Sequence, residues 1–285
     1  MTAPRPATPP PTSLADRFIR RFNFVSYMAA TLAMYAVAAT ALGIAAAPAL
    51  WFLSSTIGWA ASLPVWLAWP MFGTLIALAF FIAGFALLAV VPVYNFVMPT
   101  GVTRYKGQYY TIAALPWFLH NALFYLVRFT FLPFVTLTPF GIWFLKGMGM
   151  KMGKRPYINT ELISDPQLIT LGDDVVIGGS ATIFAHYGGG GHLTIEPVEI
   201  HDRATIGLRA TVMGDVIVGA GATILAHSVL LPGSRVGEGE TWGGVPARPI
   251  SREEMDRFKA LIRREGAPAE VGLSSGAPDG DLSAG

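Results

Sequence analysis

Large apolar residues recur every six positions through the C-terminal half of the chain, three times before an interruption and eight times after it. A helix repeats about every 3.6 residues and a flat strand every two, so neither produces this spacing. A triangular coil produces it, because each flat face takes about six residues and turns one large apolar side chain to the axis. Three repeats then make one turn, with glycine or another small residue at the corners. The apolar positions are Leu171, Ile177, Ile183, Ile200, Ile206, Val212, Val218, Ile224, Leu230, Val236 and Trp242, and the small residues include Ala181, Ala204, Ala210, Ala222 and Ser228.

These repeats resemble those of the hexapeptide-repeat acyltransferases, whose fold is a left-handed parallel β-helix. The resemblance covers about residues 153–250 and is most specific in ATIGLRATV and in the closing GGVPARPI, which is similar to the ending of acetyltransferases related to the maltose and xenobiotic enzymes. The stretch from Phe144 to Ile183 looks like the membrane-attached terminal region of nonribosomal-peptide-synthetase-like proteins. The resemblance therefore implies a fold and an acyl-transfer activity, but no particular substrate.

The N-terminal part of the chain is apolar enough to cross a membrane. No Asp, Glu, Lys or Arg occurs from Phe22 to Thr103, and about 20 apolar residues span a bilayer as a helix. We expect two spans, at about residues 26–53 and 65–94, joined by a short connection around SSTIGWAASLP with tryptophans at the membrane interface. A buried apolar hairpin is the alternative. A cleaved signal peptide is disfavoured, because the first run is too long for a signal core and a second span follows.

Basic residues flank this hairpin and are absent from the loop between its spans. Arg17, Arg20 and Arg21 come before the first span, and Arg104 and Lys106 follow the second. The positive-inside rule therefore predicts a multi-pass protein of the inner membrane with both ends of the hairpin, and the coil, in the cytoplasm. A formal net charge of +2, concentrated beside the membrane, favours anionic lipid over nucleic acid as a partner.

The remaining segments complete the predicted organisation. Residues 109–145 are apolar but interrupted by prolines, and predict either two more helices or a segment that dips into one leaflet and returns. Ser251 and Glu254 have capping-box spacing and predict a helix that covers the last turn of the coil. The predicted parts are a disordered start over 1–15, transmembrane and interfacial helices over 16–150, the left-handed β-helix over 151–250, the capping helix over 251–265 and a disordered tail over 266–285.

The interruption lies between Ile183 and Ile200, whose separation is not a multiple of six and so fits neither two nor three repeats. An insertion in a solenoid usually marks a functional face. The resemblance implies that the catalytic histidine lies at such a loop, and His186 is the residue that matches; His192 is the alternative. An imidazole is a competent base for an acceptor that attacks a thioester. Backbone N–H groups of Gly188–Gly191 are the expected oxyanion donors.

The resemblance implies further site residues. The asparagine that assists the acceptor oxygen in the family falls near Asn159 or Glu161. The coenzyme of the family is held along a corner of the coil, mostly by backbone groups, with basic side chains near the nucleotide phosphates. The corresponding coenzyme-binding positions here are Leu208, Ala226, His227, Gly244 and Arg248, with Arg209 and Arg235 as further phosphate-binding candidates.

The predicted function is a membrane-bound acyltransferase that moves an acetyl or other acyl group from acetyl-CoA, or another thioester, to a hydroxyl or amine. The acceptor is expected to be membrane-associated, such as a glycan, a lipid headgroup or a peptide product, and the resemblance implies a homotrimer. No metal is expected: the γ-carbonic anhydrases share the coil, but the spacings among His186, His192, His201 and His227 do not provide their three zinc ligands. Cysteine is absent, which excludes disulfides and thiolate sites. The alternative is a non-enzymatic scaffold that anchors a synthetase or carrier protein at the membrane.

Overall fold

The computed structural model describes residues 14–109 and 111–265. It divides into two units, Met1–Pro249 and Ile250–Gly285, which are described separately. The predicted disordered start lies outside the described residues, except that helix α1 already begins at Leu14. The predicted disordered tail, residues 266–285, also lies outside them.

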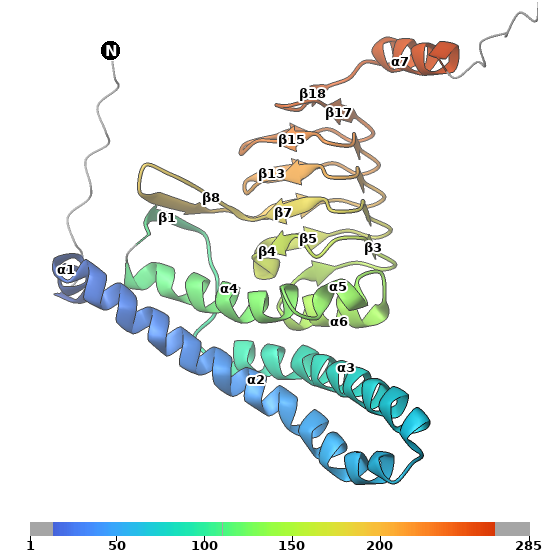
Figure 1. Ribbon diagram of the computed structural model, residues 1–285. Helices are drawn as coiled ribbons and strands as arrows, with labels where there is room; N and C mark the ends of the chain where they lie inside the picture. Colours follow the sequence, from blue (N-terminus) through green and yellow to red (C-terminus); the bar gives the residue numbers. More distant parts are fainter. Residues whose placement is uncertain (1–13, 110, 266–285) are drawn as a thin grey trace, which may run out of the picture. The chain divides into compact units, whose positions relative to one another are not determined.

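Two long helices follow α1 (Leu14–Arg21): α2 (Asn23–Ala61) and α3 (Val65–Val97) pack side by side as a hairpin (Figure 1). Both are long and apolar enough to cross a membrane. Their 39 and 33 residues extend about 58 and about 50 Å, compared with a hydrocarbon core of about 30 Å. The predicted helices are confirmed, and their membrane crossing stays a prediction.

The connection between these helices is shorter than predicted. Residues 54–61 continue α2, and the hydroxyls of Ser54 and Ser55 donate back to the Trp51 carbonyl at 2.8 Å. The helix continues because nothing in this stretch prevents it before Pro64, which precedes α3.

The apolar segment after α3 forms short helices between the hairpin and the first turn of the coil (Figure 1). They are η1 (Ile112–Ala114), α4 (Leu115–Arg128), α5 (Leu132–Val135) and α6 (Pro139–Gly147). The 14 residues of α4 extend only about 21 Å, too short to span a bilayer. Of the two alternatives for residues 109–145, two more spanning helices are therefore wrong.

Polar contacts join these helices to the coil. The buried His120 of α4 has its Nδ1 2.8 Å from Asn95 Oδ1 of α3. Gln167, from the base of the coil, donates through Nε2 to the Thr100 carbonyl at 3.0 Å and accepts from Val102 N at 2.8 Å. These bonds fix the end of α3 against the coil.

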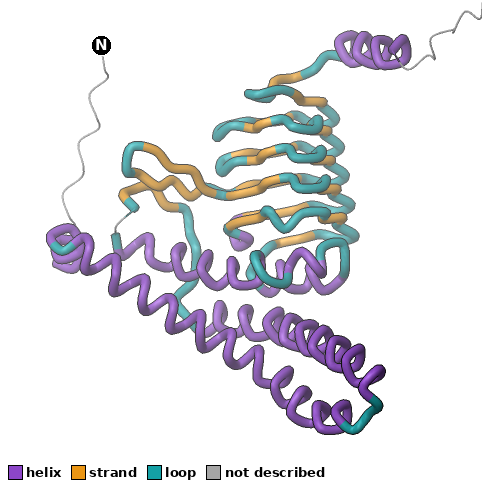
Figure 2. Tube along the Cα trace, viewed as in Figure 1, coloured by secondary structure: helices purple, strands orange, loops and turns teal. Residues whose placement is uncertain are grey.

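The predicted coil is confirmed as a parallel β-solenoid (Figures 1 and 2). Ile206 lies between Ile177 of the turn before and Ile224 of the turn after, and the other apolar positions pair in the same register. Three parallel sheets run along it, in the orders β16-β13-β10-β5-β2, β17-β14-β11-β6-β3 and β15-β12-β7-β4. The handedness stays a prediction. The strands are β2 (Lys151–Met152), β3 (Tyr157–Ile158), β4 (Ile163–Ser164), β5 (Ile169–Leu171), β6 (Val176–Ile177), β7 (Thr182–Phe184), β10 (Val198–Ile200), β11 (Thr205–Ile206), β12 (Thr211–Val212), β13 (Val216–Val218), β14 (Thr223–Ile224), β15 (Val229–Leu230), β16 (Arg235–Val236), β17 (Thr241–Gly243) and β18 (Arg248–Pro249).

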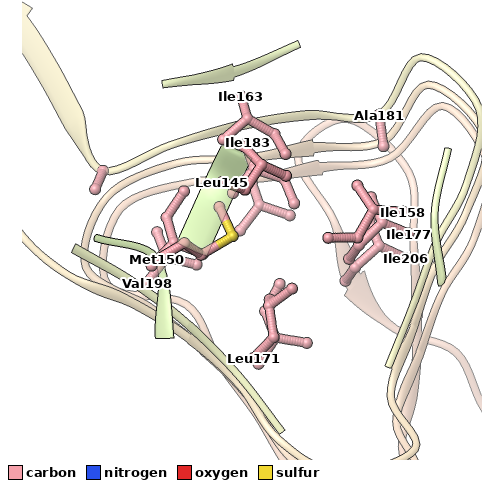
Figure 3. Packing of buried hydrophobic residues seen from close by; sticks show 14 of the residues in the cluster. Leu145, Met150, Ile158, Ile163, Leu171, Ile177, Ala181, Ile183, Val198 and Ile206 are labelled. Carbon is pink, nitrogen blue, oxygen red and sulfur yellow. The ribbon is translucent and has the colours of Figure 1, made fainter. Parts of the chain in front are cut away.

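The core of the coil is continuous with that of the helices. The apolar repeat positions from Leu171 to Val236 are buried along the axis, and Leu145 and Met150 lie in the same cluster as Ile163, Ile183 and Val198 (Figure 3). The helical segment therefore closes the N-terminal end of the coil, which would otherwise expose unpaired strands and apolar side chains.

Two kinds of position make the corners. A glycine directly after the apolar residue lets the next turn approach: a Cβ at Gly207 would lie 2.6 Å from the backbone nitrogen of Ala226. The third residue after the apolar one has a positive φ in turn after turn, and it includes non-glycine residues such as Arg209 and His227, at φ 53° and 59°. Close approach and left-handed backbone are thus separate requirements at neighbouring positions.

The second unit contains α7 (Arg252–Glu265). Ser251 caps it, since its Oγ accepts a hydrogen bond from Glu254 N at 3.1 Å. The predicted helix is confirmed, and its capping of the coil stays a prediction.

Candidate active site

The interruption is a β-hairpin that extends away from the coil. One full turn of the coil runs from Ile183 to its partner Val212, and the next runs from Val212 to its partner Leu230. The first of these turns contains many more residues, because the interruption lies within it. Strands β8 (His186–Gly189) and β9 (His192–Ile195) form the hairpin, and β1 (Tyr105–Gln108) pairs antiparallel with β9. The segment that follows α3 and the β-hairpin that leaves the coil thus form one small sheet, in the order β1-β9-β8 (Figure 1).

His186 lies at the base of this hairpin, beside Asp165 of the preceding turn. Its Nδ1 is 2.5 Å from Asp165 Oδ2. Because a carboxylate oxygen only accepts, Nδ1 carries the hydrogen, and Nε2 of the neutral ring has the free lone pair. The His186 side chain is 24% exposed, whereas that of Asp165 is fully buried. The arrangement is that of a base oriented by a carboxylate, with one nitrogen left for a substrate.

Asp165 is held by residues from both parts of the chain. Trp117 Nε1 and Asn121 Nδ2 of α4 donate to its Oδ1 at 2.7 and 2.8 Å, and Ala185 N donates to Oδ2 at 3.1 Å. Burial raises the pKa of Asp165, but the hydrogen bonds and charge of His186, with those of Asn121 and Trp117, bring it below its usual range. The carboxylate therefore stays charged beside the imidazole.

The backbone of Asp165 is left-handed, as it is at eight other non-glycine residues of the described chain. Its φ of 58° and ψ of 48° are left-handed, and Pro166 follows, a neighbour that disfavours helical backbone. Left-handed backbone costs a non-glycine residue about 1–2 kcal/mol. Here the four hydrogen bonds to the carboxylate hold it.

Aromatic rings surround the imidazole. The Trp117 ring lies edge-on to that of His186 at 5.0 Å between centroids, and the Phe184 ring lies at 5.5 Å. These rings limit the orientations of His186.

Sequence reasoning missed Asp165, Trp117 and Asn121. Trp117 and Asn121 are 48 and 44 residues from the carboxylate that they bind, so no local pattern connects them. One signal was available at Asp165: Ile163 and Leu171 hold equivalent core positions, but their spacing exceeds the regular period of six, and Asp165 lies in that excess.

The structure does not bring Asn159 or Glu161 to His186 within the described residues. Asn159 lies at the opposite end of the same flat face, with its amide against Gly179. About seven residues of extended chain, or about 20 Å, separate Gly179 from His186. The Glu161 carbonyl accepts from Ile163 N at 2.8 Å. Their helper role stays a prediction.

The predicted coenzyme-binding residues do come together. Leu208, Ala226 and Gly244 occupy one corner in successive turns, where His227 N donates to the Leu208 carbonyl at 2.8 Å. Arg248 pairs with Gly243 across β17 and β18, beside the same corner. We call this row the corner column. It is continuous with Gly179 and Asn159, and one flat face separates it from His186.

The turn of the glycine run lies far from His186, and an oxyanion role for Gly188 and Gly189 stays a prediction. Gly190 and Gly191 form the hairpin turn at φ 59° and 84°, about four residues or about 13 Å beyond His186. That distance is too great for their N–H groups to contact an oxyanion beside Nε2. Gly188 also allows Tyr109 to approach, because a Cβ there would overlap the hydroxyl of Tyr109.

The other candidate groups are peripheral. Within the described residues, His192 Nδ1 contacts only the Gly190 carbonyl, at 3.3 Å. Within the same described residues, no group of three or more His, Asp or Glu side chains is placed to hold a metal ion.

No protein-family model and no curated protein matches this chain. Solved acetyltransferases are similar to it. A hexapeptide-repeat acetyltransferase from Vibrio cholerae O1 biovar eltor, complexed with acetyl coenzyme A, is 26% identical over 37% of this chain and 61% of its own, with a TM-score of 0.34. A maltose O-acetyltransferase from Clostridium difficile 630 is 21% identical over 37% of this chain and 59% of its own, with a TM-score of 0.32.

A galactoside acetyltransferase in complex with coenzyme A is 19% identical over 45% of this chain and 80% of its own, with a TM-score of 0.35. The chain spans 61% and 59% of the lengths of the first two of these proteins. The similarity therefore concerns part of each molecule.

Proposed function

We propose that this chain is a membrane-attached acyltransferase that moves an acetyl or other acyl group from a coenzyme A thioester to a hydroxyl or amine. The observation that carries the proposal is the His186–Asp165 pair, in which a fully buried carboxylate holds Nδ1 of a partly exposed imidazole. The resemblance of the repeats and of GGVPARPI to acyltransferases supports the same chemistry. Acetyl coenzyme A is the donor to test first.

In the proposed reaction, His186 Nε2 takes the proton of the acceptor O–H or N–H while the acceptor atom bonds to the thioester carbonyl carbon. The carbon–sulfur bond then breaks, and Nε2 returns the proton to the departing sulfur. The products are an ester or amide and a free thiol, and the imidazole is neutral again. Asp165 stabilises the imidazolium between these steps and fixes the ring orientation. A positioned base of this kind contributes about 10²–10⁴-fold to the rate.

The corner column is the proposed site for the coenzyme, with Arg248 and Arg209 near its phosphates. The column and His186 occupy different corners of one chain, so a second copy would have to bring its column to this His186. This separation supports the predicted homotrimer, and it would place Asn159 near the base of a neighbouring copy. Mass photometry in mild detergent tests it: a fully active monomer would contradict the trimer.

The proposed location is the inner membrane, crossed by α2 and α3, with the coil in the cytoplasm. The basic residues that flank the α2–α3 helical hairpin support this topology. Single cysteines at Ser62, between the helices, and at Ser234, in the coil, test it in intact cells. An impermeant reagent added outside should label Ser62→Cys only; labelling of Ser234→Cys would reverse the topology.

Replacement of His186 tests the catalytic role. His186→Ala should lower acyl transfer by about 10²–10⁴-fold and leave coenzyme A affinity unchanged, because the coenzyme is proposed to bind elsewhere. His192→Ala, in the same hairpin, is the matched control and should keep its rate. Equal rates for wild type and His186→Ala would remove the assignment. A wild-type protein that binds no coenzyme A would favour the scaffold alternative.

A further inference from the structure

An apolar pocket of 420 Å³ lies between the start of α2 and the start of α4. Ser26, Ala30 and Met34 of α2 line one side, and Tyr109, Leu115 and Phe118 line the other. The volume is within the range of small-molecule sites, about 300–1,000 Å³. From Ser26 to Met34 the pocket follows α2 for about 12 Å, so its shape suits an elongated ligand.

One layer of aromatic side chains separates this pocket from His186. The Phe118 ring, which lines the pocket, packs at 4.8 Å between centroids against that of Trp117. Trp117 in turn contacts His186 at 5.0 Å and donates to Asp165. Tyr109 makes a second connection, since its hydroxyl lies against Gly188 of the His186 hairpin. A ligand in the pocket therefore touches Phe118 and Tyr109, which pack against Trp117 and against the hairpin that holds the proposed base.

The pocket is mostly apolar, with a few polar side chains in its lining. Tyr109 and Thr111, which follow β1, line it from one side, and Tyr27 and Thr31 of α2 line it from the other. Ser26 also lines the pocket, and its Oγ is buried with no hydrogen-bond partner among the described residues.

We propose that this pocket binds the acyl chain of a membrane lipid, and that a lipid hydroxyl or amine is the acceptor of the transferred group. The proposal rests on the acyltransferase function proposed above. We choose a lipid as the ligand because α2, which forms one wall of the pocket, is one of the two helices able to cross a membrane. Charge agrees, because α1 exposes Arg17 and Arg21 just before Ser26, where they attract anionic headgroups. Lipid tails are already in an apolar phase, so the pocket selects by fit.

Photolabelling of the full chain tests the occupant. The protein is placed in phosphatidylcholine and phosphatidylglycerol vesicles that contain a phospholipid with a photoactivatable acyl chain, and labelled residues are mapped by mass spectrometry. Leu115 and Phe118 should be labelled above the exposed Phe96 of α3. Ala30→Trp fills the pocket and should reduce their labelling to the Phe96 level. Ala36→Trp, on the opposite face of α2 and outside the pocket, should not.

Radiolabelled acetyl coenzyme A distinguishes failure of this inference from failure of the acyltransferase function. Ala30→Trp should lose transfer to vesicle lipid while it still binds coenzyme A, and Ala36→Trp should keep both. Equal labelling of Phe96 and Phe118, or transfer to lipid that Ala30→Trp leaves intact, would overturn the pocket. Pocket labelling in a protein that binds no coenzyme A would support the lipid site and contradict the acyltransferase function.

Discussion

The regular coil and the hairpin that interrupts it are held by different kinds of contact. In the coil each turn pairs with the next one along the chain, through the same apolar positions. The hairpin instead pairs with chain from far earlier in the sequence, as where Ile195 lies opposite Tyr105. Its His186 depends on Asp165, which depends on two side chains of α4. The repeating part is thus the scaffold, and the candidate active site lies where non-repeating contacts join the coil to the helices.

The first prediction removes the carboxylate that joins the two regions. Asp165→Asn keeps size and tolerates the left-handed backbone, but its amide can donate to His186 Nδ1 and so favour the wrong tautomer. Acyl transfer should fall by about 10²–10⁴-fold with coenzyme A affinity unchanged, as measured by steady-state kinetics and calorimetry.

A matched control for this variant lies in the regular coil. Asp174 also has left-handed backbone, at φ 55°, and its carboxylate pairs with exposed Arg155 at 2.6 Å. Asp174→Asn should change the rate little, because surface ion pairs contribute about 0–1 kcal/mol. If the two variants had the same rate, Asp165 would have no special function.

The difference between the regions also explains which features could be predicted. Strands from Leu171 onward follow from a local period, because one apolar residue per face suffices to define the register. The turn before it, with Met152, Ile158 and Ile163, lies within the β-helix predicted over 151–250, but its register could not be predicted because its spacing to Leu171 is irregular. His186 was found because the resemblance pointed to the loop. Its partners were not, since hydrogen bonds across 44 to 48 residues leave no sequence period.

The second prediction concerns His120, which joins α4 to the end of α3. Burial lowers the pKa of His120 to about 4 from its ordinary 6.5, although the charge of Asp165 acts in the opposite direction. Between these values the unfolded chain binds a proton that the folded chain does not. Stability is therefore full above pH 6.5 and falls as the pH decreases toward 4, by about 3 kcal/mol.

Thermal unfolding in detergent between pH 7 and pH 4.5 would measure this effect. His120→Gln cannot titrate, so its melting temperature should depend less on pH than that of the wild type, even if the variant is less stable overall. His201→Gln, at an exposed corner of the coil, should keep the wild-type dependence. An unchanged pH dependence in His120→Gln would show that the buried histidine is not linked to folding.

The third and smallest prediction compares one glycine from each region. In the coil, a Cβ at Gly207 would lie 2.6 Å from Ala226 N and 2.7 Å from the Ile224 carbonyl oxygen, both backbone atoms of the next turn. Neither can move without opening the stacked turns, so Gly207→Ala should cost about 1–3 kcal/mol. In the hairpin, nothing lies within 4 Å of a Cβ at Gly189, so Gly189→Ala should stay within about 0.5 kcal/mol. Thermal unfolding in detergent measures both. Equal melting temperatures for Gly207→Ala and Gly189→Ala would mean that the turns can separate to make room for the methyl group. Gly207→Ala should then also leave coenzyme A affinity unchanged, even though the next residue, Leu208, belongs to the corner column. A lower melting temperature together with weaker coenzyme A binding in Gly207→Ala alone would show that close stacking shapes the column.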